Sequence, residues 1–256
     1  MVLEYDGTRY SGSQLQKNGP SIQEALETAI TKLTGERVRV AFAGRTDAGV
    51  HAWGQVAVFD TASAHPLATF VEGLTYWLPR DIAVVRAAEA PPGFDPRRHA
   101  VSRTYRYLVL NRRARSPLWA FRAWHVRDAI DLAPVRRLLE WLPGKRDWAA
   151  LAGDAGGRQT VRTLTRAELR AKGPLLAFEF EAPSFLPHQV RRTVGALVDA
   201  GLGRRAVEAL IEDIERATPA SVGPVAPAHG LYLARVDYRG IDLRPPGADE
   251  TGESRA

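Results

Sequence analysis

Hydrophobic positions in the first third of the chain alternate between a period of two and a period near 3.6. The segment 2–5 predicts a short strand, and Ser21-Ile22-Gln23-Glu24 has the form of a helix-starting capping box. Apolar residues then recur on one helical face until Gly35, which is a typical helix stop. Strands are predicted around 38–42, 55–59 and 82–85, with a helix after Pro66 that ends before Pro79. The predicted order is β-α-β-β-α-β.

The rest of the chain has related content. We expect strands at 105–110, 175–181 and 231–238 and helices near 131–142, 189–200 and 206–217. Hairpin-like neighbours among mixed elements favour an α+β protein with mainly antiparallel sheets. Pro91-Pro92-Gly93 indicates a boundary. We therefore predict an N-terminal half over 1–95, a C-terminal half over 96–238 and a flexible tail over 239–256.

The segment Gly44-Arg45-Thr46-Asp47-Ala48-Gly49-Val50-His51 stands between two predicted strands. It places one carboxylate between an arginine and a glycine-containing turn, in a loop of the kind that often carries chemistry. The alternative is an ordinary turn, because aspartate and glycine are common turn residues. The decision between the two depends on the rest of the chain.

Bulk composition excludes several classes of function. The chain has 256 residues, 45% of them hydrophobic, and no cysteine, which excludes disulfides, thiolate zinc sites and cysteine nucleophiles. No apolar run approaches the ~18 residues of a membrane span, and the first residues lack a signal-peptide pattern. We therefore expect no membrane association and a cytoplasmic location.

Charge points to a polyanionic partner. The formal net charge is +6, and 31 of the 35 basic residues are arginine. Between Pro96 and Arg127 there are nine arginines and no aspartate or glutamate. Aromatic residues are interleaved with them, a composition suited to phosphate contact and base stacking. This stretch predicts nucleic-acid binding.

Other chemistries find little support. The run 201–206 matches a loose dinucleotide motif, but it follows a predicted helix where that motif needs a strand. The six histidines show no metal-binding spacing. We expect no metal and no cofactor. His51 is a candidate for substrate contact, with a packed histidine as the alternative.

A lone carboxylate such as Asp47 suits covalent catalysis. Glycosidic hydrolysis by acid and base needs two carboxyl groups at a set separation, whereas a single carboxylate can act as a nucleophile on a nucleoside. At pH 7 an aspartate with a pKa near ~3.9 is ionised roughly a thousandfold over its acid form, so it needs no base. Neighbouring Arg45 would lower that pKa further and orient the carboxylate.

The octapeptide resembles the catalytic motif of the tRNA pseudouridine synthase A family. Further similarity is found in order along residues 3–238: Glu4-Tyr5-Asp6-Gly7-Thr8 with Tyr10, Gly12, Gln14 and Gln16; Leu78-Pro79 with Asp81-Ile82; Phe94, Arg97 and Ala100; Arg103-Thr104-Tyr105-Arg106-Tyr107; Phe185 with Val190-Arg191 and Val194-Gly195; and Gly230-Leu231-Tyr232-Leu233. The motifs differ from those around the aspartate of other pseudouridine synthase families.

The resemblance implies a complete set of roles. Asp47 would be the nucleophile, Tyr105 would stack on the target base and assist proton removal, and Arg191 would pair with Asp47. Arg45, Tyr105, His51, Arg97 and Arg103 are the expected substrate-binding residues. The fold would be two ferredoxin-like (RRM-like) α/β halves with a central active-site cleft. The implied substrate is uridine 38, 39 or 40 in the tRNA anticodon stem-loop, bound by a homodimer without cofactor.

Some positions depart from the family pattern, and other functions stay open. Thr75 stands in place of Asn, Asp95-Pro96 in place of His-Ala, and Ser13 in place of Trp. The family's first strand is also longer, which implies a translation start upstream. A non-catalytic RNA-binding protein is the main alternative, favoured by the arginine stretch. A base-exchanging transglycosylase, which also uses an aspartate, is a third.

Overall fold

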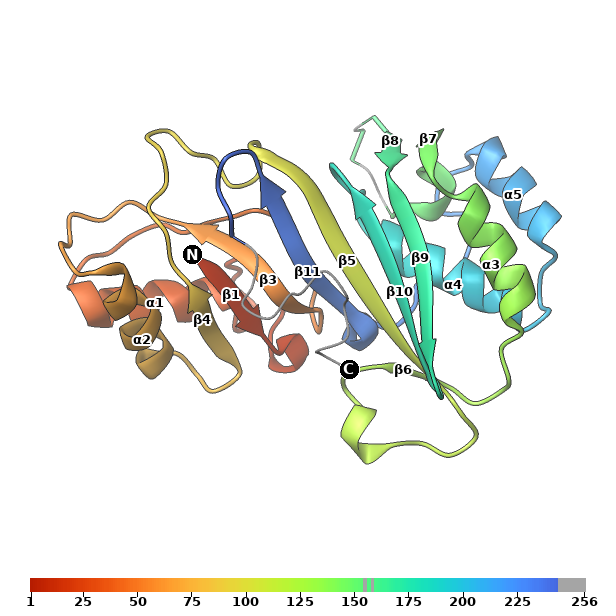
Figure 1. The fold of residues 1–256 in the computed structure, drawn as a ribbon, viewed down its shortest axis with the longest axis horizontal. Coiled ribbons are helices and arrows are strands. Elements are labelled where there is room, and N and C mark those ends of the chain that lie inside the picture. The colour runs from red at the N-terminus through yellow and green to blue at the C-terminus, as the bar shows by residue number, and fades with distance from the viewer. Residues whose placement is uncertain (154–155, 158, 244–256) are drawn as a thin grey trace. The chain divides into compact units, whose positions relative to one another are not determined.

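The computed structural model describes residues 1–153, 156–157 and 159–243, and these form two compact units. Unit 1 contains residues 1–103 together with the segment from Tyr232 onward, and unit 2 contains Thr104–Leu231. The chain passes from unit 1 to unit 2 inside one strand and returns at the start of another (Figure 1). Most of the predicted tail, from residue 244 onward, lies outside the described residues.

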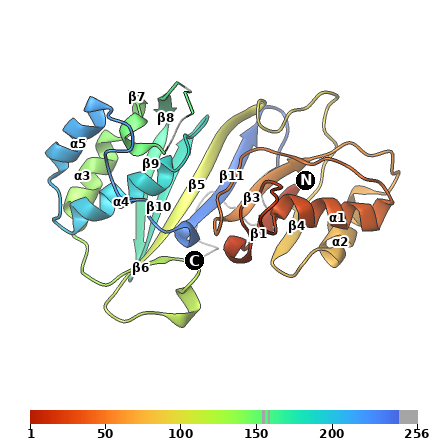
Figure 2. The same cartoon turned by 180° about the vertical axis from the view of Figure 1, so that it is seen from behind.

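Unit 1 has the predicted order of elements. They are β1 (Val2–Tyr5), α1 (Ile22–Thr34), β2 (Ala41–Phe42), β3 (His51–Val58), α2 (Leu67–Trp77) and β4 (Ile82–Arg86). β1 pairs antiparallel with both β3 and β4, and β2 pairs antiparallel with β3. β11 (Leu231–Tyr238) adds to β3 in parallel register, with Tyr232 opposite His51. Both helices lie along one face of these strands (Figure 2).

Helix α1 begins and ends where the sequence predicts. The Ser21 hydroxyl accepts the backbone N–H of Glu24 at 3.1 Å, and Gly35 takes the left-handed conformation with φ 77°. Its apolar stripe is buried, with Leu26 and Ile30 fully covered. The predicted helix thus has both its caps and its core face.

The strands around the octapeptide differ from the prediction. The first is only Ala41–Phe42, because the backbone at Val40 is bonded by helix α1: its N–H donates to Glu27 and its carbonyl accepts from Gln23. The second starts at His51, inside the octapeptide, where we expected Gln55. Pairing with β1 and with β11 accounts for the earlier start, since β1 pairs with Ala52 and β11 pairs with both His51 and Ala52.

Unit 2 combines antiparallel strands with three helices. β5 (Ala100–Asn111) begins in unit 1, and β10 (Leu175–Ala182) and β9 (Arg166–Lys172) follow it in the order β5-β10-β9. β6 (Trp124–Val126) runs parallel to β5, while β7 (Gly144–Asp147) and β8 (Val161–Leu164) form a separate antiparallel pair. The helices are α3 (Leu132–Trp141), α4 (Gln189–Gly201) and α5 (Val207–Arg216). Trp148, Tyr107, Phe178 and Phe180 are among its largest fully buried side chains.

The α+β class with mainly antiparallel pairing is confirmed. Four strands of unit 2 were not predicted, namely β6, β7, β8 and β9. No helix in the described part of the chain has the length and apolar character of a membrane span.

Candidate active site

Asp47 lies on the loop that joins β2 to β3. The side chains of Arg45, Asp47 and Ala48 are exposed, whereas Thr46 and Val50 are buried. Asp47 and Ala48 are thus exposed between two buried residues of the loop.

Thr46 is the most firmly held residue of the loop. Its Oγ1 lies 2.9 Å from the hydroxyl of Tyr5, its backbone N–H donates to Oγ of Ser13 at 2.9 Å, and its carbonyl accepts the N–H of Ser13 at 3.0 Å. Tyr5 and Ser13 are themselves buried. The N-terminal motif and the octapeptide, separate in sequence, thus form one hydrogen-bonded assembly.

The tyrosine hydroxyl at this position stays protonated. Burial raises the pKa of Tyr5 to about 12, against the opposing effect of its hydrogen bonds to Thr46 and Gln55. Gln55 Nε2 lies 3.4 Å from the Tyr5 oxygen and donates to the carbonyl of Gly44 at 2.8 Å. The Tyr5 oxygen accepts from Gln55, so its own proton is available for Thr46.

The second half of the loop is a tight turn. The N–H of Val50 donates to the carbonyl of Asp47 at 3.1 Å, and Gly49 sits in the left-handed region with φ 76°. Gly7 of the N-terminal motif packs so closely that a Cβ there would come within 1.9 Å of the Val50 carbonyl oxygen. A side chain at Gly7 would therefore displace the turn.

His51 lies inside unit 1. Its ring is 2% exposed, accepts the N–H of Gly7 on Nδ1 at 3.1 Å, and stacks on Tyr232 with ring centroids 4.7 Å apart. Trp53 also stacks on Tyr232, with ring centroids 4.2 Å apart. The packed-histidine alternative describes this environment, in which the ring of β3 contacts the turn after β1 and a tyrosine of β11.

Arg97 and Arg103, both expected to bind substrate, have different environments. Arg103 is 7% exposed, and its guanidinium donates to the carbonyls of Ala43 and Arg97 at 2.8 and 2.7 Å. It joins the start of β5 to the strand end that precedes the octapeptide. Arg97 has an exposed side chain.

The departure at Asp95-Pro96 forms a compact turn before Arg97. The Asp95 carboxylate accepts the N–H groups of Arg97 and Arg98 at 2.8 and 2.9 Å. These backbone hydrogen bonds, with that of Arg98 the larger influence, hold the pKa of Asp95 below its ordinary value. The aspartate thus orders the backbone that presents Arg97.

In unit 2, Tyr105 and Tyr107 share a face of β5 but differ in burial. Tyr105 is half-buried and meets Phe185 edge-on, with ring centroids 5.1 Å apart. Tyr107 is fully buried, donates to the carbonyl of Pro227 at 2.7 Å, and has its pKa raised by burial. Of the two rings, Tyr105 retains the exposure that contact with a base needs.

Arg191 stands in the first turn of α4 and is half-buried. Its Nε donates to the carbonyl of Ala226 at 2.7 Å, and its own carbonyl accepts the N–H of Ala226 at 3.2 Å. The segment that holds Tyr107 through Pro227 also holds Arg191 through Ala226. The strand that carries Tyr105 and the helix that carries Arg191 are therefore joined through one segment of unit 2.

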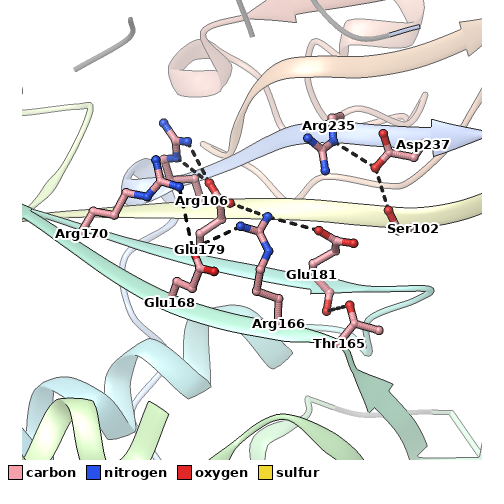
Figure 3. Close-up of polar contacts among 10 residues, drawn as sticks. All are labelled: Ser102, Arg106, Thr165, Arg166, Glu168, Arg170, Glu179, Glu181, Arg235 and Asp237. Carbon is pink, nitrogen blue, oxygen red and sulfur yellow. Dashed lines mark hydrogen bonds and ion pairs between the residues drawn. The ribbon is translucent and has the colours of Figure 1, made fainter. Parts of the chain in front are cut away.

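The arginine stretch divides into two groups. Seven of its nine arginines are exposed, namely Arg97, Arg98, Arg112, Arg113, Arg115, Arg122 and Arg127. The other two serve the fold: Arg103 as described, and Arg106 by pairing with Glu179 of β10. Figure 3 shows Arg106, Glu179, Arg166 and Glu181 linked across β5, β10 and β9. Between β5 and β6 the exposed arginines accompany the exposed side chains of Leu118 and Phe121.

Three supports of the candidate site have no role predicted from the sequence: Tyr5, Ser13 and Gln55. Gln55 carries a usable signal in the sequence, since it is a polar residue directly before the apolar residues 56–59 of a predicted strand. The structure buries it fully. Ser13 is distinguished in the sequence only as a departure from a family pattern. No group of three or more His, Cys, Asp or Glu side chains within the described residues is arranged to hold a metal ion.

A surface-exposed aspartate on an anchored loop and an arginine-rich surface are features of an enzyme that modifies RNA. The chain belongs to the tRNA pseudouridine synthase family, whose profile matches residues 1–97 and 139–239. Enzymes of this family are isomerases.

Individual relatives are similar in sequence to nearly the whole of this chain. A protein of Myxococcus xanthus named tRNA pseudouridine synthase A is 43% identical over 256 residues, covering 99% of this chain and 97% of the relative. Proteins of the same name from Geobacter sulfurreducens and Neisseria gonorrhoeae are 43% and 40% identical. The alignments cover 93% and 94% of this chain and 98% and 91% of those relatives.

Proposed function

We propose that this chain converts uridine to pseudouridine at positions 38, 39 and 40 of the tRNA anticodon stem-loop, with Asp47 as the nucleophile. The observation that carries the proposal is the exposed carboxylate of Asp47 on a loop whose flanking peptides are hydrogen-bonded to unit 1. Family membership supplies the reaction class. The fixed loop supplies a reason why this carboxylate is the reacting group.

The reaction conserves every atom of the nucleotide. The bond from ribose C1′ to N1 of uracil breaks, the base turns, and a bond from C1′ to C5 forms. The C5 proton leaves and N1 gains a proton. Asp47 forms the transient covalent adduct, at C1′ of the sugar or at the base ring, and is released unchanged. The scheme requires neither metal nor cofactor.

Three other residues have proposed roles, namely Tyr105 and Arg191 of unit 2 and Arg45 of unit 1. Tyr105, half-buried beside Phe185, stacks on the target base and assists removal of the C5 proton. By resemblance, Arg191 pairs with the Asp47 carboxylate. Arg45, exposed two residues before Asp47, holds the flipped-out nucleotide. Extraction of the base from its stack costs a few kcal/mol, which contacts in the site offset.

The positive charge of the exposed arginines supports a polynucleotide as the partner. The exposed arginines between β5 and β6, together with Arg97 and Arg98, suit the phosphates of a folded RNA, and Leu118 and Phe121 suit contact with its bases. By resemblance we further propose that two copies of the chain bind the tRNA in the cytoplasm. The pairing of β1 with β3 and β4 supports a ferredoxin-like arrangement of unit 1.

Tritium release from tRNA tests the nucleophile. With tRNA labelled at C5 of uracil, the wild type should release label at catalytic enzyme concentration, and Asp47→Asn should bind tRNA but release none. Asp60→Asn, which alters another exposed carboxylate of unit 1, is the matched control and should keep wild-type release. Undiminished release by Asp47→Asn would refute the assignment. Tight binding without release by the wild type would instead establish a non-catalytic RNA-binding protein.

The mass of the tRNA separates isomerisation from base exchange. A transglycosylase would release free uracil and change the tRNA mass, whereas isomerisation leaves the mass unaltered. Intact-mass measurement on the reacted tRNA therefore distinguishes the two reactions.

A further inference from the structure

We propose that Ser13 and Tyr5 are positioning residues for the reaction, acting on Asp47 through Thr46. The proposal rests on Asp47 being the nucleophile. It goes further by naming which side chains fix the direction of that carboxylate.

Each peptide group next to Thr46 is held by Ser13. The peptide between Arg45 and Thr46 is fixed when the Thr46 N–H donates to Ser13 Oγ, at 2.9 Å. The peptide between Thr46 and Asp47 is fixed when the Thr46 carbonyl accepts the N–H of Ser13, at 3.0 Å. Because a peptide group is planar, fixing its carbonyl oxygen also fixes the N and Cα of the next residue. The Cα of Asp47 is thereby placed by Ser13.

The peptide on the other side of Asp47 is also held. Its carbonyl accepts the N–H of Val50 at 3.1 Å. With both neighbouring peptides fixed, the φ and ψ of Asp47 are fixed too. The backbone that carries the Asp47 carboxylate therefore has a fixed direction.

Tyr5 holds Thr46 from its side chain. Its hydroxyl lies 2.9 Å from Thr46 Oγ1, and both residues are buried, at 3% and 6% exposure. Close packing adds a steric restraint, since a Cβ on Gly12 would come within 2.8 Å of the Thr46 carbonyl oxygen. Backbone, side chain and packing therefore all restrain one residue, which is the residue directly before the proposed nucleophile.

Removing the Ser13 hydroxyl leaves the buried N–H of Thr46 without its partner while the Ser13 backbone bond remains. The loop should then shift to satisfy that N–H, because an unpaired buried donor is unfavourable. A small misplacement of a reacting group strongly lowers the rate of a covalent step. We expect Ser13→Ala to lower kcat about tenfold, equivalent to about 1.4 kcal/mol of transition-state stabilisation. KM for tRNA should stay the same.

Ser21→Ala is the matched control. Ser21 is also a buried serine of unit 1 whose Oγ accepts one backbone N–H, that of Glu24 at 3.1 Å, but it caps helix α1 and does not touch the loop. Both variants should lose comparable thermal stability. Steady-state tritium release, measured well below both melting temperatures, should fall in kcat for Ser13→Ala and stay at the wild-type value for Ser21→Ala.

Tyr5→Phe is the second probe and keeps the aromatic ring in place. It should also lower kcat with unchanged KM, and the double variant with Ser13→Ala should lose less than the product of the two single effects, because both act through Thr46. Wild-type kcat in both single variants, or an equal fall of kcat in Ser21→Ala, would overturn the positioning role.

Asp47→Asn is measured in the same assay. Full activity of Asp47→Asn would overturn the assignment of Asp47 as the nucleophile. If Asp47→Asn is inactive while Ser13→Ala keeps the wild-type kcat, only the positioning role is overturned.

Discussion

Arg106 of β5 and Glu179 of β10 form an ion pair across neighbouring strands, with 2.8 Å from Nη2 to Oε2 and side-chain exposures of 17% and 10%. Glu179 also forms an ion pair with Arg166 of β9, with 2.6 Å from Oε1 to Nη2 (Figure 3). One carboxylate thus bridges two arginines, one on the strand to each side of it. Removing one partner of an ion pair this well covered leaves charge uncompensated away from solvent, which costs more than breaking an exposed pair.

Glu179→Gln should lower the free energy of unfolding by about 2 kcal/mol at pH 7, because Arg106 and Arg166 lose their shared counter-charge. Urea unfolding measures the change. Glu208→Gln is the control, since Glu208 pairs with Arg137 at 68% and 59% exposure and should shift stability by less than about 0.5 kcal/mol. Equal effects of the two substitutions would contradict the role of the covered pair.

The Glu179 carboxylate should also make the free energy of unfolding depend on pH. Burial acts to raise the pKa of Glu179, but hydrogen bonding to Arg106 and the charges of Arg106, Arg166 and Arg170 outweigh it and hold the pKa below its ordinary value. The stabilisation is therefore complete above the unfolded-state pKa near ~4.3 and is lost as the pH falls through the folded-state pKa. Unfolding measured from pH 7 to pH 3 should show a shallower acid loss in Glu179→Gln than in the wild type.

Gly7→Ala should disrupt the candidate site through sterics alone. A Cβ at this position would lie 1.9 Å from the Val50 carbonyl oxygen, so the turn after Asp47 must move. We expect tritium release to fall at least tenfold, with the melting temperature also lowered. Gly35→Ala is the comparison, since Gly35 has φ 77° and open space around its Cβ position. That variant should lose about 1 kcal/mol of stability and keep its activity.

Tyr105→Phe should separate base stacking from proton removal. The phenylalanine ring keeps the stacking surface, so tRNA affinity should be retained, while turnover should fall about 10²-fold or more without the hydroxyl. Tyr107→Phe, two residues along the same strand, removes a hydroxyl that donates to the Pro227 carbonyl at 2.7 Å. It should lower stability by about 1 kcal/mol and leave turnover at the wild-type value. Rapid turnover by Tyr105→Phe would exclude its hydroxyl from the proton transfer.

Exposed arginines of the segment between β5 and β6 should contribute to tRNA affinity by neutralising phosphates. Arg113→Ala with Arg115→Ala should weaken binding and reduce the slope of log affinity against log salt by about 0.7 to 0.9 for each phosphate that is no longer neutralised. Arg137→Ala alters an exposed arginine of α3 that already pairs with Glu208, and it should leave the slope unchanged. Filter binding across a salt series gives both slopes. An unaltered slope in the double variant would place the RNA elsewhere.

Local sequence signals predicted the elements that local interactions determine. Helix α1 has its cap at Ser21 and its stop at Gly35, and β11 covers the predicted residues 231–238. Strand β9 was missed because its apolar positions are two alanines and one leucine. It is held by antiparallel pairing with β10 along its whole length and by the ion pairs of Arg166 with Glu179 and Glu181, which no local pattern can show.

In the candidate site, too, the sequence predicted what local motifs contain but not the contacts between distant residues. Asp47, Tyr105 and Arg191 are predicted from motifs, and each motif lies within a short stretch of sequence. The Thr46 anchor could not be found in this way, since it joins Tyr5 and Ser13 to a residue more than thirty positions away. The burial of His51 likewise depends on Tyr232, which comes from the last strand.

That last strand has a consequence for the order in which the protein can form during synthesis. Unit 2 is inserted within unit 1, and Tyr232 of β11 covers both His51 and Trp53. A ribosome must therefore complete the whole inserted unit before the strand that finishes the Asp47-bearing unit emerges. Nascent chains that stop before residue 231 should therefore expose the His51 and Trp53 rings to solvent and to chaperones.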